Sequence, residues 1–251
     1  LGWLNQKIKE PMYRVGHDRN FWIWEKYDDS FTYLMVADVA RGDGSDSSTF
    51  HILKLETMEI VAEYQGKPSL DMYSNMLYQA GQEYGTCLLV VENNGIGISV
   101  LEKLIDLGYV DSKRVGAWGW SGGGYFTCLM VTRNSKYFKT GVAIAPCTDF
   151  RLYDTAYTER YMGSLETNKS GYDSTNVLSW IYRMKGSLLL MHGSNDDNVH
   201  LQHTSKFVNH ALSLGKDVEW YNYPNKNHGI YGGGSRKHLY QKMIDYFNRN
   251  L

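Results

Sequence analysis

The sequence predicts an α/β protein made of two segments, and three observations lead to that prediction. Strand-like apolar runs alternate with amphipathic helical patterns, which is typical of a sheet covered by helices. Hydrophobic residues make up 43% of the 251 residues and charged residues 21%, so the chain can form a core and is not a disordered protein. The net charge also changes sign near residue 108.

This charge change separates residues 1–108 from residues 109–251. The first segment has 9 Lys and Arg against 16 Asp and Glu, and the second has 17 against 11. Such a contrast indicates two regions of different origin or role. We therefore predict a domain boundary at Gly108-Tyr109, and the negative charge of the first segment weighs against autonomous DNA binding.

The first segment predicts the order β-β-β-α-β-α. Its elements are expected at residues 31–39, 49–55, 58–64, 69–84, 86–92 and 98–107. The three strands are rich in apolar and β-branched residues, and a short turn joins the last two as a hairpin. Ser69 can cap the first helix. The run Thr-Cys-Leu-Leu-Val-Val-Glu at residues 86–92 is typical of a buried parallel strand.

The second segment alternates more regularly between strands and helices. Strands are expected at 114–120, 141–145, 187–192 and 218–223, and helices from about 125, at 201–214 and at 236–250. This alternation predicts a parallel sheet with helices on both sides. Residues 114–120 are apolar on both faces, so we expect a central strand there. Because the net charge and the sequence motifs both change at the predicted domain boundary, we expect two separate sheets, with an exposed apolar edge.

The termini and apolar runs place limits on localisation. No apolar run approaches the ~18 residues of a membrane helix, and no signal segment follows Leu1. We expect a chain that is incomplete at its N-terminus. Neither a compartment nor an oligomeric state is predicted.

A nucleophile motif lies between the strand at 114–120 and the following helix. Residues 119–123, Gly-Trp-Ser-Gly-Gly, fit G-x-S-x-G in the strand–turn–helix context of a nucleophile elbow. Glycines permit the sharp turn that exposes Ser121. The amide of Gly122, at the helix N-terminus, is a candidate oxyanion donor.

Candidate partners of Ser121 follow two later strands. Asp196 and Asp197 come after the strand at 187–192, and His228 comes after the strand at 218–223. The carboxyl ends of parallel strands meet at one edge, where such sites form. The chain order Ser, Asp, His is that of α/β-hydrolases. His228 can accept the Ser121 proton, and one of the two aspartates can orient the imidazole.

Four segments of residues 109–251 resemble the prolyl oligopeptidase family, and most closely its dipeptidyl peptidase IV branch. They are the nucleophile region at 117–125, the segment at 153–163 (Tyr-Asp-Thr-Ala-Tyr-Thr-Glu-Arg-Tyr-Met-Gly), and the loops His192-Gly193 to His200 and Asn227-His228-Gly229. The resemblance implies the C-terminal part of an α/β-hydrolase fold. It also implies that Asp196 is the triad acid.

The same resemblance implies a substrate site for a proline-like residue. Its lining would be Trp120, Tyr153, Tyr157 and Asn198, with Tyr157 as a ring wall and Asn198 holding the substrate carbonyl. Gly122 stands where the family commonly has tyrosine. The family's earlier strands and second oxyanion donor, a tyrosine hydroxyl, have no counterpart in residues 1–108. One such donor is worth about 10²–10³ in rate, so we expect impaired activity.

Two acids of the first segment end neighbouring predicted strands. Asp38 and Glu92 would emerge at one sheet edge and could hold Mg²⁺ or Mn²⁺; solvated strand-end acids are the alternative. Residues 37–46 and 91–97, with 10–16 and 21–24, resemble the RNase H-like nuclease domain of phage large terminase subunits. That resemblance implies metal-binding roles for Asp38 and Glu92 and an accessory role for Asp46, without placing a third acid.

We interpret the chain as a composite, in which a partial RNase H-like segment precedes a hydrolase segment. The leading hypothesis is a serine peptidase that cleaves peptides after proline or alanine and needs no cofactor. A metal-dependent DNA nuclease is the second hypothesis. A catalytically impaired composite of two truncated domains is the third.

Overall fold

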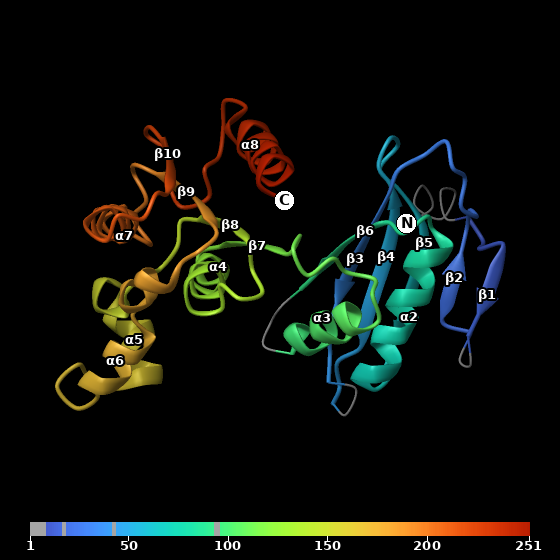
Figure 1. The fold of residues 1–251 in the computed structure, drawn as a ribbon, viewed down its shortest axis with the longest axis horizontal. Coiled ribbons are helices and arrows are strands. Elements are labelled where there is room, and N and C mark those ends of the chain that lie inside the picture. Colours follow the sequence, from blue (N-terminus) through green and yellow to red (C-terminus); the bar gives the residue numbers. More distant parts are fainter. Residues whose placement is uncertain (1–8, 17–18, 42–43, 93–95) are drawn as a thin grey trace, which may run out of the picture. The chain divides into compact units, whose positions relative to one another are not determined.

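The computed structural model describes residues 9–16, 19–41, 44–92 and 96–251. The chain divides into two compact units, residues 1–111 and 112–251 (Figure 1). The first ends close to the predicted boundary. Residues 42–43 and 93–95, which belong to the terminase-like motifs, lie outside the described residues.

The first unit contains a six-stranded sheet. Its strands are β1 (Tyr13–Val15), β2 (Phe21–Ile23), β3 (Tyr33–Asp38), β4 (Ser48–Lys54), β5 (Glu59–Gly66) and β6 (Leu88–Val91). Their order in the sheet is β1-β2-β5-β4-β3-β6. All neighbours are antiparallel except β6, which runs parallel to β3 and pairs Val91 with Ala37.

Two helices, α2 (Leu70–Glu83) and α3 (Gly97–Asp106), cover one face of this sheet (Figure 1). Ser69 caps α2 through a bond from the Met72 amide, as expected. Tyr73 and Leu77 of α2 and Leu104 of α3 are fully buried against the strands. The predicted order β-β-β-α-β-α is confirmed from β3 to α3. The short strands β1 and β2 were not predicted, because they are too short to show a period.

The second unit contains a parallel sheet with the order β10-β9-β8-β7. Its strands are β7 (Gly116–Trp120), β8 (Thr140–Ile144), β9 (Ser187–Gly193) and β10 (Glu219–Tyr223). Its helices are α4 (Gly122–Arg133), α5 (Thr155–Met162), α6 (Lys169–Thr175), α7 (Gln202–Ser213) and α8 (Ser235–Asn250), with 3-10 turns η1 (Phe150–Leu152) and η2 (Val177–Arg183).

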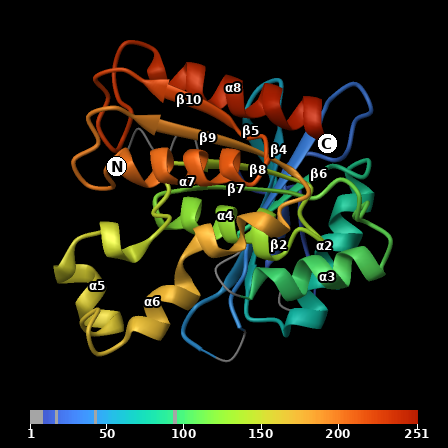
Figure 2. The same cartoon turned by 60° about the vertical axis from the view of Figure 1, so that its left-hand side comes forward.

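Helices lie on both faces of this parallel sheet, as predicted (Figure 2). Leu239 and Tyr246 of α8 pack against one face of β8 and β9. On the other face, a Cβ at Gly141 of β8 would lie 2.6 Å from Val131 of α4, so glycine allows that helix to approach closely. The central strands β8 and β9 are buried on both sides because helices cover both faces.

The two sheets are separate, as the charge and motif change predicted. The expectation of a central elbow strand is wrong, because β7 lies at the edge of its sheet. Its Trp118 side chain is 44% exposed. Apolar residues on both faces of a strand indicate that helices cover those faces or that aromatic rings project from them into solvent. They do not indicate how many strands pair with it in the sheet.

No helix of the described ranges combines the length and the apolar character that crossing a membrane requires.

Candidate active site

Three loops at one edge of the parallel sheet carry the predicted triad residues. Ser121 follows β7, Asp196 follows β9 and His228 follows β10. All three strands run in the same direction, so their carboxyl ends lie along a common edge.

Ser121 occupies a strained turn between β7 and α4. Its backbone has φ 59° and ψ −115°, a combination that non-glycine residues rarely adopt. The Ser121 amide donates to the Ile144 carbonyl at 2.8 Å, which holds the turn against β8. A Cβ at Gly119 would lie 2.2 Å from the backbone of Gly123, so the close return of the chain requires glycine there.

The helix after the elbow begins at Gly122, earlier than the expected start near Tyr125. The Gly122 amide therefore belongs to the first turn of α4, where free N–H groups and the helix dipole favour negative charge. Gly122 is exposed, and nothing lies within 4 Å of where its Cβ would be. Its place in the helix supports the predicted role of an oxyanion donor.

Asp196 and His228 form a direct pair. The distance from His228 Nδ1 to Asp196 Oδ2 is 2.7 Å. The Asp196 side chain is fully buried, whereas the His228 side chain is 23% exposed. Asp197 is exposed, so the structure distinguishes between the two aspartates that the sequence left open.

Further donors surround the buried Asp196 carboxylate. The amides of Asn198 and Val199 donate to its Oδ1 at 3.0 and 2.9 Å. Burial alone would raise the pKa of Asp196, but the hydrogen bonds from His192 and His228 outweigh it and hold that pKa below its ordinary value. An ionised carboxylate only accepts hydrogen bonds, so Nδ1 of His228 carries a hydrogen and Nε2 is free to accept one.

The second imidazole beside Asp196, His192, was missed by the sequence analysis. It is fully buried at the end of β9, with its Nε2 3.2 Å from Asp196 Oδ2 and 2.8 Å from the Val199 carbonyl. A carbonyl only accepts, so Nε2 is the donor and Nδ1 accepts from the Thr204 hydroxyl at 2.8 Å. The spacing of four residues between His192 and Asp196 was the available signal.

The histidine loop contacts the elbow strand through Trp120. The Trp120 indole Nε1 donates to the His228 carbonyl at 2.9 Å. Within the described residues, no hydrogen bond joins the Ser121 hydroxyl to the His228 imidazole. The structure thus brings the elbow and the histidine loop together through Trp120, the residue that precedes the nucleophile.

The residues expected to bind a proline-like ring lie on two loops of this unit. Tyr153 donates its hydroxyl to Oδ1 of Asn198 at 3.0 Å. Burial first, and the nearby Asp154 second, raise the pKa of Tyr153, so its hydroxyl keeps the proton that this bond needs. The Tyr157 ring meets Tyr153 edge-on with centroids 5.6 Å apart, and it remains 51% exposed.

The two acids of the first unit lie side by side. Asp38 ends β3 and Glu92 follows β6, and the Glu92 amide donates to the Ala37 carbonyl at 2.8 Å. The hydrogen bond with Asp38 raises the pKa of Glu92, and burial and the negative charge of Asp38 add to this. The predicted emergence of both carboxylates at one edge is what the strand pairing produces.

A metal centre needs more ligands than this pair provides. Across the described ranges, no three His, Cys, Asp or Glu side chains are grouped for metal binding. Asp46 lines a depression together with Arg41 and Ile96, and the described side chains do not group it with the other two acids as metal ligands. The described residues thus offer Mg²⁺ or Mn²⁺ two carboxylates, and water would have to fill the rest of its coordination shell.

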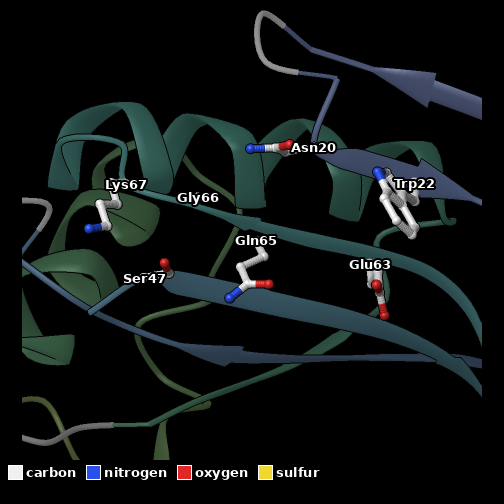
Figure 3. Close-up of a pocket in the computed structure, with 7 residues that line it drawn as sticks. All are labelled: Asn20, Trp22, Ser47, Glu63, Gln65, Gly66 and Lys67. Atoms are coloured by element: carbon white, nitrogen blue, oxygen red, sulfur yellow. The ribbon is translucent and has the colours of Figure 1, made fainter. Parts of the chain in front are cut away.

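The same unit has a concave site elsewhere that the sequence analysis missed. A cavity of about 460 Å³ lies against β5, and Glu63 and Gln65 project into it from one side of that strand (Figure 3). Its lining residues are Asn20, Trp22, Ser47, Glu63, Gln65, Gly66 and Lys67. None of the predicted metal-binding acids is among them, so this cavity does not belong to the acid pair.

The chain is similar in sequence to known peptidases. The family model of the prolyl oligopeptidase family matches residues 97–251. Dipeptidyl peptidase 4 of Felis catus is 31% identical over 97% of this chain and 34% of its own length. Venom dipeptidyl peptidase 4 of Vespula vulgaris is 33% identical over 88% of this chain and 29% of its own length. The chain therefore spans about a third of these relatives.

A solved structure is similar to part of the chain. The dipeptidyl peptidase 4 of Porphyromonas gingivalis is 42% identical, with a TM-score of 0.60, over 61% of this chain and 22% of that protein. The family match includes all of the strands and loops that carry Ser121, Asp196 and His228.

Proposed function

This chain belongs to the prolyl oligopeptidase family, and on that premise we propose that it acts as a serine peptidase that cleaves peptides after proline or alanine. The observation that carries the proposal is the 2.7 Å hydrogen bond between His228 and a buried Asp196. Trp120, the residue before the strained Ser121, donates to the His228 carbonyl and so links the elbow to this pair. An imidazole fixed in this way can serve as a base toward Ser121.

In the proposed reaction, Ser121 attacks the carbonyl carbon of the substrate while His228 Nε2 takes the hydroxyl proton. Asp196 stabilises the imidazolium that forms, and the Gly122 amide stabilises the negative oxygen. His228 returns the proton to the leaving amine, which leaves an acyl ester on Ser121. Water then releases the acid by the same steps, so proton and bond changes balance over the cycle.

Preference for proline or alanine rests on the two tyrosines and Asn198. The exposed Tyr157 ring, set edge-on to Tyr153, offers an apolar wall suited to a pyrrolidine ring. The Asn198 amide nitrogen can donate to a substrate carbonyl while its Oδ1 is fixed by Tyr153. We propose that Trp120, next to the nucleophile, also lines this site.

We further propose that turnover is slow. The Gly122 amide is the oxyanion donor that we assign, and one further donor of this kind is worth about 10²–10³ in rate. A fluorophosphonate needs one covalent step at Ser121, whereas peptide turnover needs both acylation and release of the acyl group, so labelling is the more sensitive assay.

For the first unit, we propose a partial RNase H-like fold that is similar to terminase nuclease domains. The strand pairing supports this proposal. Strands β3, β4 and β5 are antiparallel, and β6, which follows α2 in the chain, pairs with β3 in parallel. The described residues of this unit bring two of the expected acids together, and we propose at most weak binding of a divalent cation there.

The test of the peptidase proposal is labelling with a fluorophosphonate probe, followed by peptide mapping. We expect one label per chain, on Ser121, and none in Ser121→Ala. Hydrolysis of a Gly-Pro anilide should be lost in the same variant. Labelling that persists in Ser121→Ala would contradict the assignment of the nucleophile.

A further inference from the structure

Arg236, at the start of α8, makes contacts that the proposed reaction does not use. Its Nε donates to the carbonyl of Gly229, the residue after His228, at 2.8 Å. Its guanidinium carbon lies 4.7 Å from the centroid of the Trp120 ring and 4.2 Å from that of Tyr231. Arg236 thus touches both the elbow strand and the histidine loop.

The histidine loop has a backbone that needs such support. Ile230 is fully buried and has φ 50°, which is unfavourable for a β-branched residue. Strained conformations of this kind persist only where neighbouring contacts hold them. A Cβ at Gly229 would lie 2.1 Å from the Tyr231 ring, so that ring packs directly on the backbone next to His228.

Three glycines connect the histidine loop to α8 and bring Arg236 back to Trp120 and Gly229. Gly232, Gly233 and Gly234 all have positive φ, at 85°, 61° and 77°. They connect Tyr231 to a helix whose second residue is Arg236. A cation in the first turn of a helix opposes the helix dipole, so stabilisation of α8 does not account for arginine here.

We propose that Arg236 is a positioning residue for His228. It fixes the Gly229 carbonyl and the rings of Trp120 and Tyr231, and Trp120 in turn holds the His228 carbonyl. A planar guanidinium can stack on rings while its Nε–H donates in the plane, which an ammonium group does less well. The proposal rests on the proposed function, because it concerns the geometry in which His228 serves Ser121.

The first experiment compares Arg236→Met with the wild type in the full chain. We expect the second-order rate constant for fluorophosphonate labelling to fall about tenfold to a hundredfold, since small displacements of catalytic groups have effects of that size. Arg236→Lys should lose less. Lys237→Met, which removes the exposed neighbouring charge, should label at the wild-type rate. Wild-type labelling by folded Arg236→Met, or by Arg236→Lys if the methionine variant does not fold, would overturn the proposal.

A second readout does not depend on catalysis. The proton between His228 Nδ1 and Asp196 should give a low-field NMR signal that His228→Ala removes. We expect Arg236→Met to broaden or remove it at a temperature where the circular dichroism is that of the wild type, and Lys237→Met to preserve it. A sharp, unshifted signal in Arg236→Met would refute the positioning role. If the signal depends on Arg236 and the wild type is not labelled, the positioning role stands and the proposed function fails.

Discussion

The two units both gather carboxylates where parallel strands end, but the surroundings give those carboxylates opposite properties. Asp196, after β9, receives hydrogen bonds from two imidazoles and two backbone amides, and its pKa lies below the ordinary value. Glu92, after β6, faces Asp38, and its pKa lies above the ordinary value. The difference shows that sheet topology places acidic residues at a common edge, whereas the hydrogen-bond donors around each acid determine its pKa and its chemical role.

This difference has a chemical consequence for each unit. A buried carboxylate that stays ionised can orient and charge-stabilise an imidazole, as Asp196 does for His228. Two carboxylates that compete for a proton offer a cation fewer negative ligands, and no third ligand joins them within the described residues.

The largest expected effect is that of Asp196→Asn. The neutral amide keeps the shape of the side chain but no longer favours the His228 tautomer that leaves Nε2 free, so peptidase kcat/KM should fall by about 10³–10⁴. Hydrolysis of a Gly-Pro anilide measures the change. The matched control is Asp197→Asn on the exposed neighbour, which should retain activity within about twofold of the wild type. Equal losses in both variants would remove the distinction between the two acids.

The elbow glycines should differ strongly in their effect on stability. Gly119→Ala places a Cβ 2.2 Å from the Gly123 backbone, which cannot move without breaking the turn, so we expect a loss of about 3 kcal/mol. Gly122→Ala meets nothing within 4 Å and should change stability by less than about 0.5 kcal/mol. Urea unfolding of the two variants measures this, and similar losses would show that the turn is not the cause.

Binding of Mn²⁺ should distinguish the acid pair of the first unit from a metal centre. With two carboxylates we expect a Kd no tighter than about 1 mM, abolished by combining Asp38→Ala with Glu92→Ala. Isothermal titration calorimetry on the full chain measures it. Micromolar binding that survives both substitutions would place a different cation site in the chain.

The smallest expected effect concerns Glu92→Gln. Because the folded-state pKa of Glu92 is raised, its ionised form destabilises the folded chain at neutral pH, and that cost disappears as the pH falls below the folded-state pKa. Glutamine should therefore raise stability at pH 7 by a few tenths of a kcal/mol, since the group is exposed to solvent and screened. At pH 3 the gain should vanish. A constant gain at both pH values would exclude repulsion from Asp38 as its origin.

The sequence predicted those parts of the fold that have a period or a motif. Strands β3, β8 and β9 and helix α2 have apolar patterns of adequate length, and the triad loops follow from G-x-S-x-G and the strands after it. Helices α5 and α6 were not predicted, because they are short and lack a sustained apolar stripe. Their boundaries depend on side-chain caps such as Asp154 and Asn168.

The contacts that support the triad could not be predicted from the sequence. His192 is four residues from Asp196, but the strand and loop between them determine whether the two side chains meet. The contact of Arg236 with Trp120 joins residues far apart in the chain, through a loop whose three positive-φ glycines leave no periodic signal. The edge position of β7 depends on which strands pair, which the apolar pattern of one strand does not encode.

Carboxyl-carbon NMR titration of the full chain tests the central comparison most directly, because both acids report from one sample. The account predicts that Asp196 titrates below its ordinary value of 3.8 and Glu92 above its ordinary value of 4.5. His228→Ala should shift the Asp196 titration upward and leave that of Glu92 unchanged. Ordinary titration of both carboxyl groups in the wild type would contradict the account.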